Sequence, residues 1–321
     1  MAAATRSPLD PASEHAQTIA TLRDGDAVDA VFACTRKERQ ISRAGTPYLT
    51  LELRDSTGAI LARAFRDADT LAGRFERGQL VRVRGRVQRF RDELQIELRA
   101  IEQADGPDAD PARFLPTAYR DRDELEGFLE HLAREVYDPP LKALLERILG
   151  DRALREQIRL APCSLPGQAG SARAPSGHHA YLGGLLEHTV AVATMALELC
   201  PLHPRLDRDL LLCAAIVHDL GKTREFTYGA SIEHSEEGRL LGHVALGLEL
   251  IAGHAEDLDA ARLLALSHCV LCHHGPDAAP GGRFQSAESL ALYRINALDA
   301  TVKGALEHGL EPRRRSSRQP A

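Results

Sequence analysis

The stretch LLLCAAIVHDLGK at residues 210–222 decides the fold of the C-terminal half of this chain. Its apolar run, Leu210 to Val217, indicates a helix, and the polar pair His218-Asp219 follows directly. Gly221 comes next, and glycine is typical of a helix C-cap, so we expect the pair at a helix end. Adjacent side chains cannot share one helical stripe, but at a helix end both can reach the same cation.

Further histidines and an aspartate extend this pair into an ordered series along the C-terminal half. Each histidine alone is more often a core or surface residue than a ligand. Most members of the series, however, lie in apolar helical sequence, where an unpartnered imidazole or carboxylate is costly. We therefore expect them to share divalent cations held between facing helices. The series comprises His188, His218, Asp219, His243, His273, His274 and Asp299.

Asp219 has a special place in this prediction because a carboxylate has two oxygens. It can bridge two cations about 3.5 to 4 Å apart, which is the separation typical of two-metal phosphoester chemistry. The pattern therefore predicts a metal-dependent phosphohydrolase.

The N-terminal third has a different periodicity. Apolar and polar residues alternate with period 2, and turn signals such as 44–46 and 55–58 separate the runs. Short strands at this spacing fit a closed OB-type barrel. The predicted strands are Ala27 to Cys34, Pro47 to Leu53, Ile60 to Phe65, Leu80 to Val87 and Leu94 to Ile101.

The predicted strand VRVRGRV, residues 81–87, combines an apolar face with a basic one. Its valines point to one side, and Arg82, Arg84 and Arg86 point to the other. We interpret the arginines as a grip on single-stranded nucleic acid, with a solvated edge as the alternative. Aromatic side chains that could stack on bases are Phe32, Tyr48, Phe65, Phe75 and Phe90, at least half of which we expect in the core.

These patterns predict a multidomain chain: an N-terminal all-β OB-fold barrel followed by an all-α helical domain. The predicted segments are a flexible N-terminus at 1–21, the barrel at 22–105, an acidic proline-containing linker at 106–118, the helical domain at 119–310 and a disordered basic tail at 311–321.

The bulk composition is ordinary for a chain of 321 residues, with 44% hydrophobic residues and a formal net charge of -6. This charge argues against a protein that coats nucleic acid by charge alone. No apolar run approaches the ~20 residues of a membrane span, and the first residues do not resemble a signal peptide. We expect a cytoplasmic protein that does not contact a membrane and whose six cysteines remain thiols.

Four phrases resemble a known family in the same order. They are HHAYLGGLLEHT at 178–189, HDLGK at 218–222, EGRLLGH at 237–243 and HHG at 273–275. They are similar to the HD phosphohydrolase superfamily and, within it, to the YhaM family of 3′ to 5′ exoribonucleases. The resemblance covers both halves of the chain, roughly residues 25 to 305.

The resemblance implies an enzyme with two manganese ions that trims single-stranded RNA or DNA from the 3′ end. It places His188, His218, Asp219 and Asp299 around one metal and His243, His273 and His274 around the second, with Asp219 bridging. It also places Lys222 against the phosphate, and His179 and Tyr181 near the substrate. One departure is that Tyr293 and Asn296 stand where the family pattern leads us to expect a histidine and an acid.

We hypothesise that metal-activated water attacks the phosphodiester in line and releases nucleoside 5′-monophosphates. A hydrolase of small or cyclic nucleotides is an alternative, because the series also resembles HD-GYP phosphodiesterases. Their Gly-Tyr-Pro signature is absent, since Pro276-Asp277 follows His274-Gly275. A non-catalytic single-strand-binding protein with a structural metal is another alternative. Homo-oligomerisation is left open.

The segment CVLCH at 269–273 has the spacing of a c-type haem attachment site. That chemistry requires export, for which the sequence shows no signal. A zinc site lacks a second cysteine pair. We therefore interpret Cys269 and Cys272 as core thiols on a helix.

Overall fold

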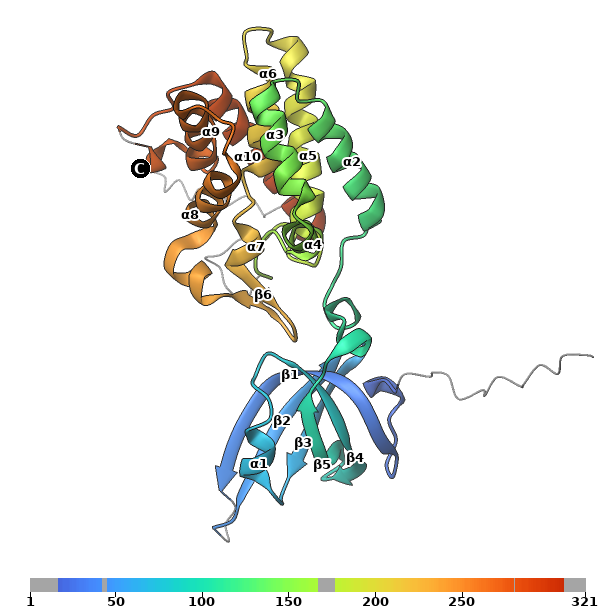
Figure 1. Ribbon diagram of the computed structural model, residues 1–321. Coiled ribbons are helices and arrows are strands. Elements are labelled where there is room, and N and C mark those ends of the chain that lie inside the picture. Colours follow the sequence, from blue (N-terminus) through green and yellow to red (C-terminus); the bar gives the residue numbers. More distant parts are fainter. Residues whose placement is uncertain (1–16, 42–44, 167–176, 280, 309–321) are drawn as a thin grey trace, which may run out of the picture. The chain divides into compact units, whose positions relative to one another are not determined.

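The computed structural model describes residues 17–41, 45–166, 177–279 and 281–308 (Figure 1). These residues divide into two compact units, and the boundary between Leu115 and Pro116 lies within the predicted linker. The linker contains two short 3-10 helices, η2 (Gly106–Ala109) and η3 (Pro111–Arg113). The predicted basic tail and the first 16 residues of the predicted flexible N-terminus lie outside the described residues.

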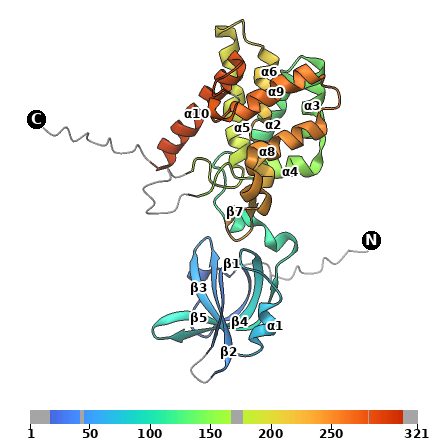
Figure 2. The same cartoon turned by 90° about the vertical axis from the view of Figure 1, so that its left-hand side faces the viewer.

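The first unit is the predicted OB-type barrel (Figure 2). Its strands close in the order β1-β2-β3-β5-β4, and all neighbours are antiparallel except β3 and β5. β1 is longer than predicted because its two ends pair with different neighbours, β4 and β2. The strands are β1 (Ala27–Ile41), β2 (Pro47–Asp55), β3 (Gly58–Ala64), β4 (Leu80–Phe90) and β5 (Glu93–Gln103), accompanied by η1 (Ile19–Thr21) and α1 (Ala68–Ala72).

The barrel interior confirms the period-2 interpretation. Val81, Val83 and Val87 of β4 are buried, and the residues between them are not. Leu49, Leu51 and Leu53 of β2 occupy the same core, as do Phe32 and Phe75.

The second unit is predominantly helical, as predicted. Several of its helices begin directly after an aspartate whose carboxylate accepts backbone N–H groups, among them Asp121, Asp138, Asp151 and Asp207. The helices are α2 (Arg122–Arg134), α3 (Pro139–Gly150), α4 (Arg152–Leu160), α5 (Gly184–Leu199), η4 (Cys200–Leu202), α6 (Arg208–Val217), α7 (Lys222–Glu225), α8 (Glu236–His254), α9 (Ala260–Cys272), η5 (Pro276–Ala278) and α10 (Ala287–His308).

This unit also contains a short hairpin, which the sequence analysis missed. β6 (Phe226–Tyr228) and β7 (Ile232–His234) pair antiparallel between α7 and α8. Three residues per strand are too few for a period-2 pattern to be visible, so the sequence gives no sign of this hairpin.

Helices α5 and α6 lie at the centre of the helical core. α6 is buried from Leu210 to Val217, and α5 is buried over most of its first three turns. The stretch Gly184–Leu202 is long and apolar enough, by length and composition, to cross a membrane, which the sequence analysis did not anticipate. A core helix meets the same criteria, and 56% of this apolar window is buried inside the protein. The two core helices carry His188 and the His218-Asp219 pair.

Candidate metal centre

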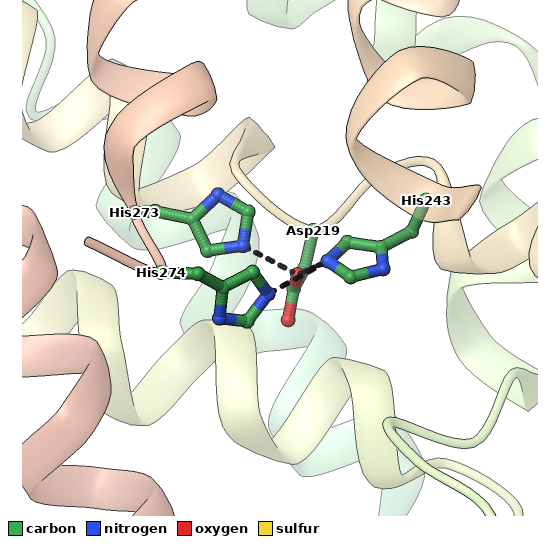
Figure 3. A group of neighbouring side chains, drawn as sticks. All are labelled: Asp219, His243, His273 and His274. Carbon is green, nitrogen blue, oxygen red and sulfur yellow. Dashed lines mark hydrogen bonds and ion pairs between the residues drawn. The ribbon is translucent and has the colours of Figure 1, made fainter. Parts of the chain in front are cut away.

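Asp219 lies at the centre of the predicted ligand series. α6 ends at Val217, and His218 keeps helical backbone angles as its C-cap, so the His218-Asp219 pair is at a helix end as expected. Asp219 Oδ2 faces the Nε2 atoms of His188 (3.5 Å) and His218 (3.4 Å). Its other oxygen, Oδ1, faces the Nε2 atoms of His243 (3.6 Å) and His273 (3.3 Å) (Figure 3).

The side chains therefore form two sets that share Asp219. We call His188, His218 and Asp219 the inner set, and Asp219, His243, His273 and His274 the outer set. In each set the candidate ligand atoms lie within 4.8 Å of one another. The inner set is fully buried, whereas His274 of the outer set is exposed.

Two imidazoles present an unprotonated nitrogen to Asp219. His218 Nδ1 donates to the Ala215 carbonyl (2.9 Å), and His273 Nδ1 donates to the Val270 carbonyl (2.6 Å). In a neutral imidazole the other nitrogen then carries a lone pair. Asp219 Oδ1 and His273 Nε2 are both buried and have no hydrogen-bond partner among the described residues. Two buried acceptors that face each other suit a cation that both can contact.

The charges around Asp219 favour the state that binds metal. Burial by itself raises the pKa of Asp219, but the buried ammonium of Lys222 opposes it, and this pKa lies well below its usual range. Burial also lowers the pKa of His218 well below its usual range. An ionised carboxylate beside neutral imidazoles is the form that coordinates divalent cations.

His243 and His274 complete the outer set from different elements. Their Nε2 atoms are 2.8 Å apart. The Nδ1 of His243 contacts the carboxylate of Glu225 at 3.1 Å, and Glu225 itself is buried.

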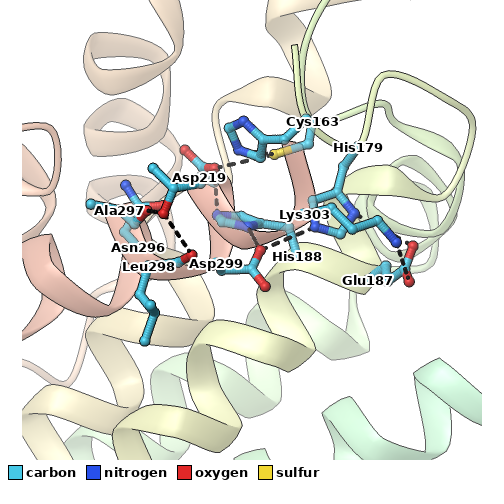
Figure 4. Close-up of polar contacts among 12 residues, drawn as sticks. Cys163, His179, Glu187, His188, Asp219, Asn296, Ala297, Leu298, Asp299 and Lys303 are labelled. Atoms are coloured by element: carbon cyan, nitrogen blue, oxygen red, sulfur yellow. Dashed lines mark hydrogen bonds and ion pairs between the residues drawn. The ribbon is translucent and has the colours of Figure 1, made fainter. Parts of the chain in front are cut away.

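Asp299 takes a different place from the one that the resemblance implied. Its Oδ2 accepts from His188 Nδ1 (2.6 Å) and from His179 Nε2 (3.0 Å) (Figure 4). The Nδ1 of His188 is the ring nitrogen that does not face Asp219. In this arrangement Asp299 contacts His188 from behind the inner set, as carboxylates commonly do for metal-ligating histidines. With His179 and His188 it also forms a further group whose candidate ligand atoms lie within 4.8 Å of one another.

The two predicted substrate residues of this half belong to the same buried network. His179 is 1% exposed, and Tyr181 donates to Glu187 Oε2 (2.6 Å). Lys303 contacts the other oxygen of Glu187 at 3.1 Å. Both predicted residues therefore support Asp299 and Glu187 in this structure, and neither one presents a free polar group to a substrate.

Lys222 also differs from its expected role. Its Nζ lies 2.9 Å from Asp219 Oδ2 and donates to the Cys163 carbonyl (2.7 Å). Burial opposes its charge, but Asp219 outweighs burial and raises the pKa of Lys222. A buried ammonium that is fully engaged in this way neutralises Asp219.

Sequence reasoning missed Cys163, His178, Glu187 and Glu225. Cys163 Sγ lies 3.7 Å from Asp219 Oδ2, and burial raises the pKa of this thiol to about 12. His178 packs edge-on against the ring of His188, and burial lowers its pKa to about 4. His178 and Glu187 lie within the phrase at 178–189 but were given no role. Cys163 and Glu225 lie outside the four quoted phrases.

Gly221 serves a purpose other than the expected helix cap. Its φ of -63° is open to any residue, but a Cβ there would lie 1.9 Å from the His243 carbonyl oxygen. Gly221 is thus needed for the close approach of α8, the helix that carries His243.

The arginines of the predicted basic stripe are partly engaged within the barrel, where two of them share a single carboxylate. Arg82 and Arg84 both pair with Asp29, at 2.7 and 3.2 Å, and Arg86 donates to the Gly25 carbonyl. Of the five aromatics only Phe32 and Phe75 are buried, which is fewer than the expected half, and Phe65 and Phe90 are 49% and 46% exposed.

Comparisons with known proteins agree with both units. Residues 185–301 match the model of the HD domain, and residues 34–104 match that of an OB-fold nucleic acid binding domain. The chain is 31% identical over 288 residues to the 3′-5′ exoribonuclease YhaM of Shouchella clausii, covering 87% of this chain and 85% of that protein. Its identity to the Bacillus velezensis protein of the same name is 30% over 254 residues, covering 78% and 77%. An HD domain with these His/Asp sets indicates dependence on a divalent metal, and the OB-fold match indicates binding of nucleic acid.

Proposed function

The chain belongs to the YhaM family of 3′-5′ exoribonucleases, and on this basis we propose that it hydrolyses single-stranded RNA from the 3′ end. The products are nucleoside 5′-monophosphates, and single-stranded DNA is a further candidate substrate. We expect this reaction to take place in the cytoplasm.

The observation that carries the proposal is the unpartnered pair formed by Asp219 Oδ1 and His273 Nε2. Both atoms are buried, 3.3 Å apart, and without a hydrogen bond to any described residue. The imidazole nitrogens suit first-row divalent transition metals, and the carboxylate is a ligand that manganese also accepts. These residues therefore fit the metal that the family implies.

We propose that the inner and outer sets each hold one cation, with Mn²⁺ as the metal, and that Asp219 contributes one oxygen to each. When bound, such cations polarise a phosphate oxygen and lower the pKa of water. Lys222 keeps Asp219 ionised, and Asp299 orients His188 through its Nδ1. Lys222 thus supports Asp219, the proposed metal ligand. Because its ammonium is buried and already contacts Asp219 and the Cys163 carbonyl, it does not bind the phosphate itself.

An aromatic patch on the barrel supports binding of a single strand. We define it as Tyr48, Arg63, Phe65, Phe90 and Arg91. The rings of Tyr48 and Phe65 stack with centroids 5.6 Å apart, and the guanidinium groups of Arg63 and Arg91 lie 5.5 and 5.3 Å from the Phe90 centroid. Neither arginine pairs with a carboxylate among the described residues. Exposed rings beside unneutralised cations suit stacked bases and their phosphates, so we propose this patch in place of the stripe formed by Arg82, Arg84 and Arg86.

A strand-binding barrel has no use in a hydrolase of small cyclic nucleotides, which disfavours that alternative. A purely structural metal is disfavoured as well, because structural sites are coordinatively closed and the two sets offer more ligands than one cation needs.

The decisive experiment incubates the purified protein with a 5′-labelled single-stranded RNA, with manganese or with chelator, and resolves the products on a sequencing gel. We expect a metal-dependent ladder that shortens from the 3′ end and is lost in Asp219→Asn. The matched control is Asp123→Asn, the same chemical change on the exposed face of α2. Unaltered nuclease activity in Asp219→Asn contradicts the proposal. An intact strand together with cleavage of cyclic dinucleotides would point to the small-nucleotide alternative.

A further inference from the structure

The two sets of the metal centre each contain one histidine whose Nδ1 contacts a carboxylate. In the inner set Asp299 binds His188 at 2.6 Å. In the outer set Glu225 binds His243, with its two oxygens 3.2 and 3.1 Å from Nδ1. The remaining buried histidines, His218 and His273, donate instead to carbonyl groups of their own helices.

The backbone around His243 makes this contact more specific. α8 is kinked at Gly242, where φ is 70° and ψ is 162°, so the helix restarts at His243. The kink leaves the backbone N–H of His243 without its helical acceptor, and this N–H points to Glu225 Oε1 at 3.3 Å. Glu225 thereby caps the restarted helix and holds its first imidazole at the same time.

Glu225 is itself held firmly in place. It is 7% exposed at the end of α7. α8 approaches so closely that a Cβ on Gly238 would lie 2.2 Å from the Glu225 carbonyl oxygen. A buried and fixed carboxylate is suited to holding one imidazole in one orientation.

We propose that Glu225 is a positioning residue that sets the cation affinity of the outer set by aiming His243 Nε2 at Asp219. The proposal rests on the proposed function, because it presupposes that the outer set binds metal. Glu225 does not lie among the ligands. It acts through His243, whose Nε2 is 3.6 Å from Asp219 Oδ1 and 2.8 Å from His274 Nε2.

The test is calorimetric titration of the chelator-stripped, full-length protein with Mn²⁺, without RNA. We expect two equivalents in the wild type. In Glu225→Gln, whose amide oxygen still accepts the His243 N–H, the affinity of one equivalent should fall about 10- to 100-fold. The control is Glu237→Gln, which removes an exposed carboxylate of α8 that pairs with Arg224. The RNA-cleavage rate of Glu225→Gln should recover at saturating Mn²⁺.

A double-mutant cycle separates positioning through His243 from a direct role. If Glu225 acts through His243, adding Glu225→Gln to His243→Ala should leave the Mn²⁺ isotherm unchanged. Additive losses, a wild-type isotherm in Glu225→Gln, or loss of helical circular dichroism in this variant before metal is added would each overturn the proposal. These outcomes differ from a wild type that binds no Mn²⁺, which would instead refute the proposed function.

Discussion

The substitution Gly221→Ala tests whether close approach between α7 and α8 builds the metal centre. The backbone angles of Gly221 are helical, so alanine by itself would be favoured there. The added Cβ, however, would lie 1.9 Å from the His243 carbonyl oxygen and 2.5 Å from the Gly247 nitrogen. Both are backbone atoms of one helix, so no side-chain rotation relieves the clash.

The required movement gives the expected magnitude. Cβ atoms do not approach other heavy atoms within 3.0 Å, so α8 must shift by about 1 Å from Gly221. Overpacking of this kind costs about 3 kcal/mol, near the upper end of its usual range. For a helical unit of this size that cost lowers the melting temperature by roughly 6 to 12 °C. The shift also carries His243 away from Asp219, so Mn²⁺ binding to the outer set should weaken.

The assay is thermal unfolding followed by circular dichroism at 222 nm, without metal and with Mn²⁺. The matched control is Gly127→Ala in α2, where a Cβ meets no atom within 4 Å. This control should stabilise the protein by about 0.5 to 1 kcal/mol because alanine is the better helix former. A melting temperature of Gly221→Ala equal to or above that of the wild type would refute the argument.

Two further predictions concern the barrel and the buried network. Phe65→Ala should weaken binding of a short single-stranded RNA by about 1 to 3 kcal/mol in fluorescence anisotropy. Arg84→Ala, which removes an arginine already paired with Asp29, should change the affinity little. A larger loss of affinity in Arg84→Ala than in Phe65→Ala would restore the basic stripe as the binding surface. Burial alone raises the pKa of Glu187, but hydrogen bonds from His179 and Tyr181 lower it from 4.5 to about 2. Its contribution to stability, up to ~3 kcal/mol, is therefore present above pH 4.5 and lost as the pH falls towards 2. The difference in urea unfolding free energy between the wild type and Glu187→Gln should accordingly shrink between pH 6 and pH 3, and a constant difference would contradict this.

The sequence alone determined the order and type of the two units. Alternation in β4 is a local pattern, and it placed Val81, Val83 and Val87 in the barrel core before any pairing was known. The apolar run that ends in His218-Asp219 likewise located a buried helix with two polar side chains at its end. Such features depend on neighbours within a few residues, which the sequence displays directly.

Whether the arginines of β4 have carboxylate partners depends on strand register, and the sequence pattern within β4 does not reveal that register. Arg84 lies opposite Asp29 because β1 pairs antiparallel with β4, although the two residues are far apart in sequence. Alternation places the arginines on the outer face of β4, and the pairing with β1 places the Asp29 carboxylate beside them on that face. Only the strand pairing reveals this contact.

In the metal centre, too, the sequence predicted which residues are present, and the tertiary structure decided their contacts. The sequence supplied the ligand series, because histidines and aspartates in apolar helices stand out. Only the tertiary structure decided that Asp299 lies behind His188, that Lys222 is buried against Asp219, and that Glu225 holds His243. These contacts arise where the end of α7 packs against a helix kinked at Gly242, and where α10 returns to α5. Hydrogen bonds between elements distant in sequence are set by packing geometry, and this is why the composition of the site was predictable while the roles of its residues were not.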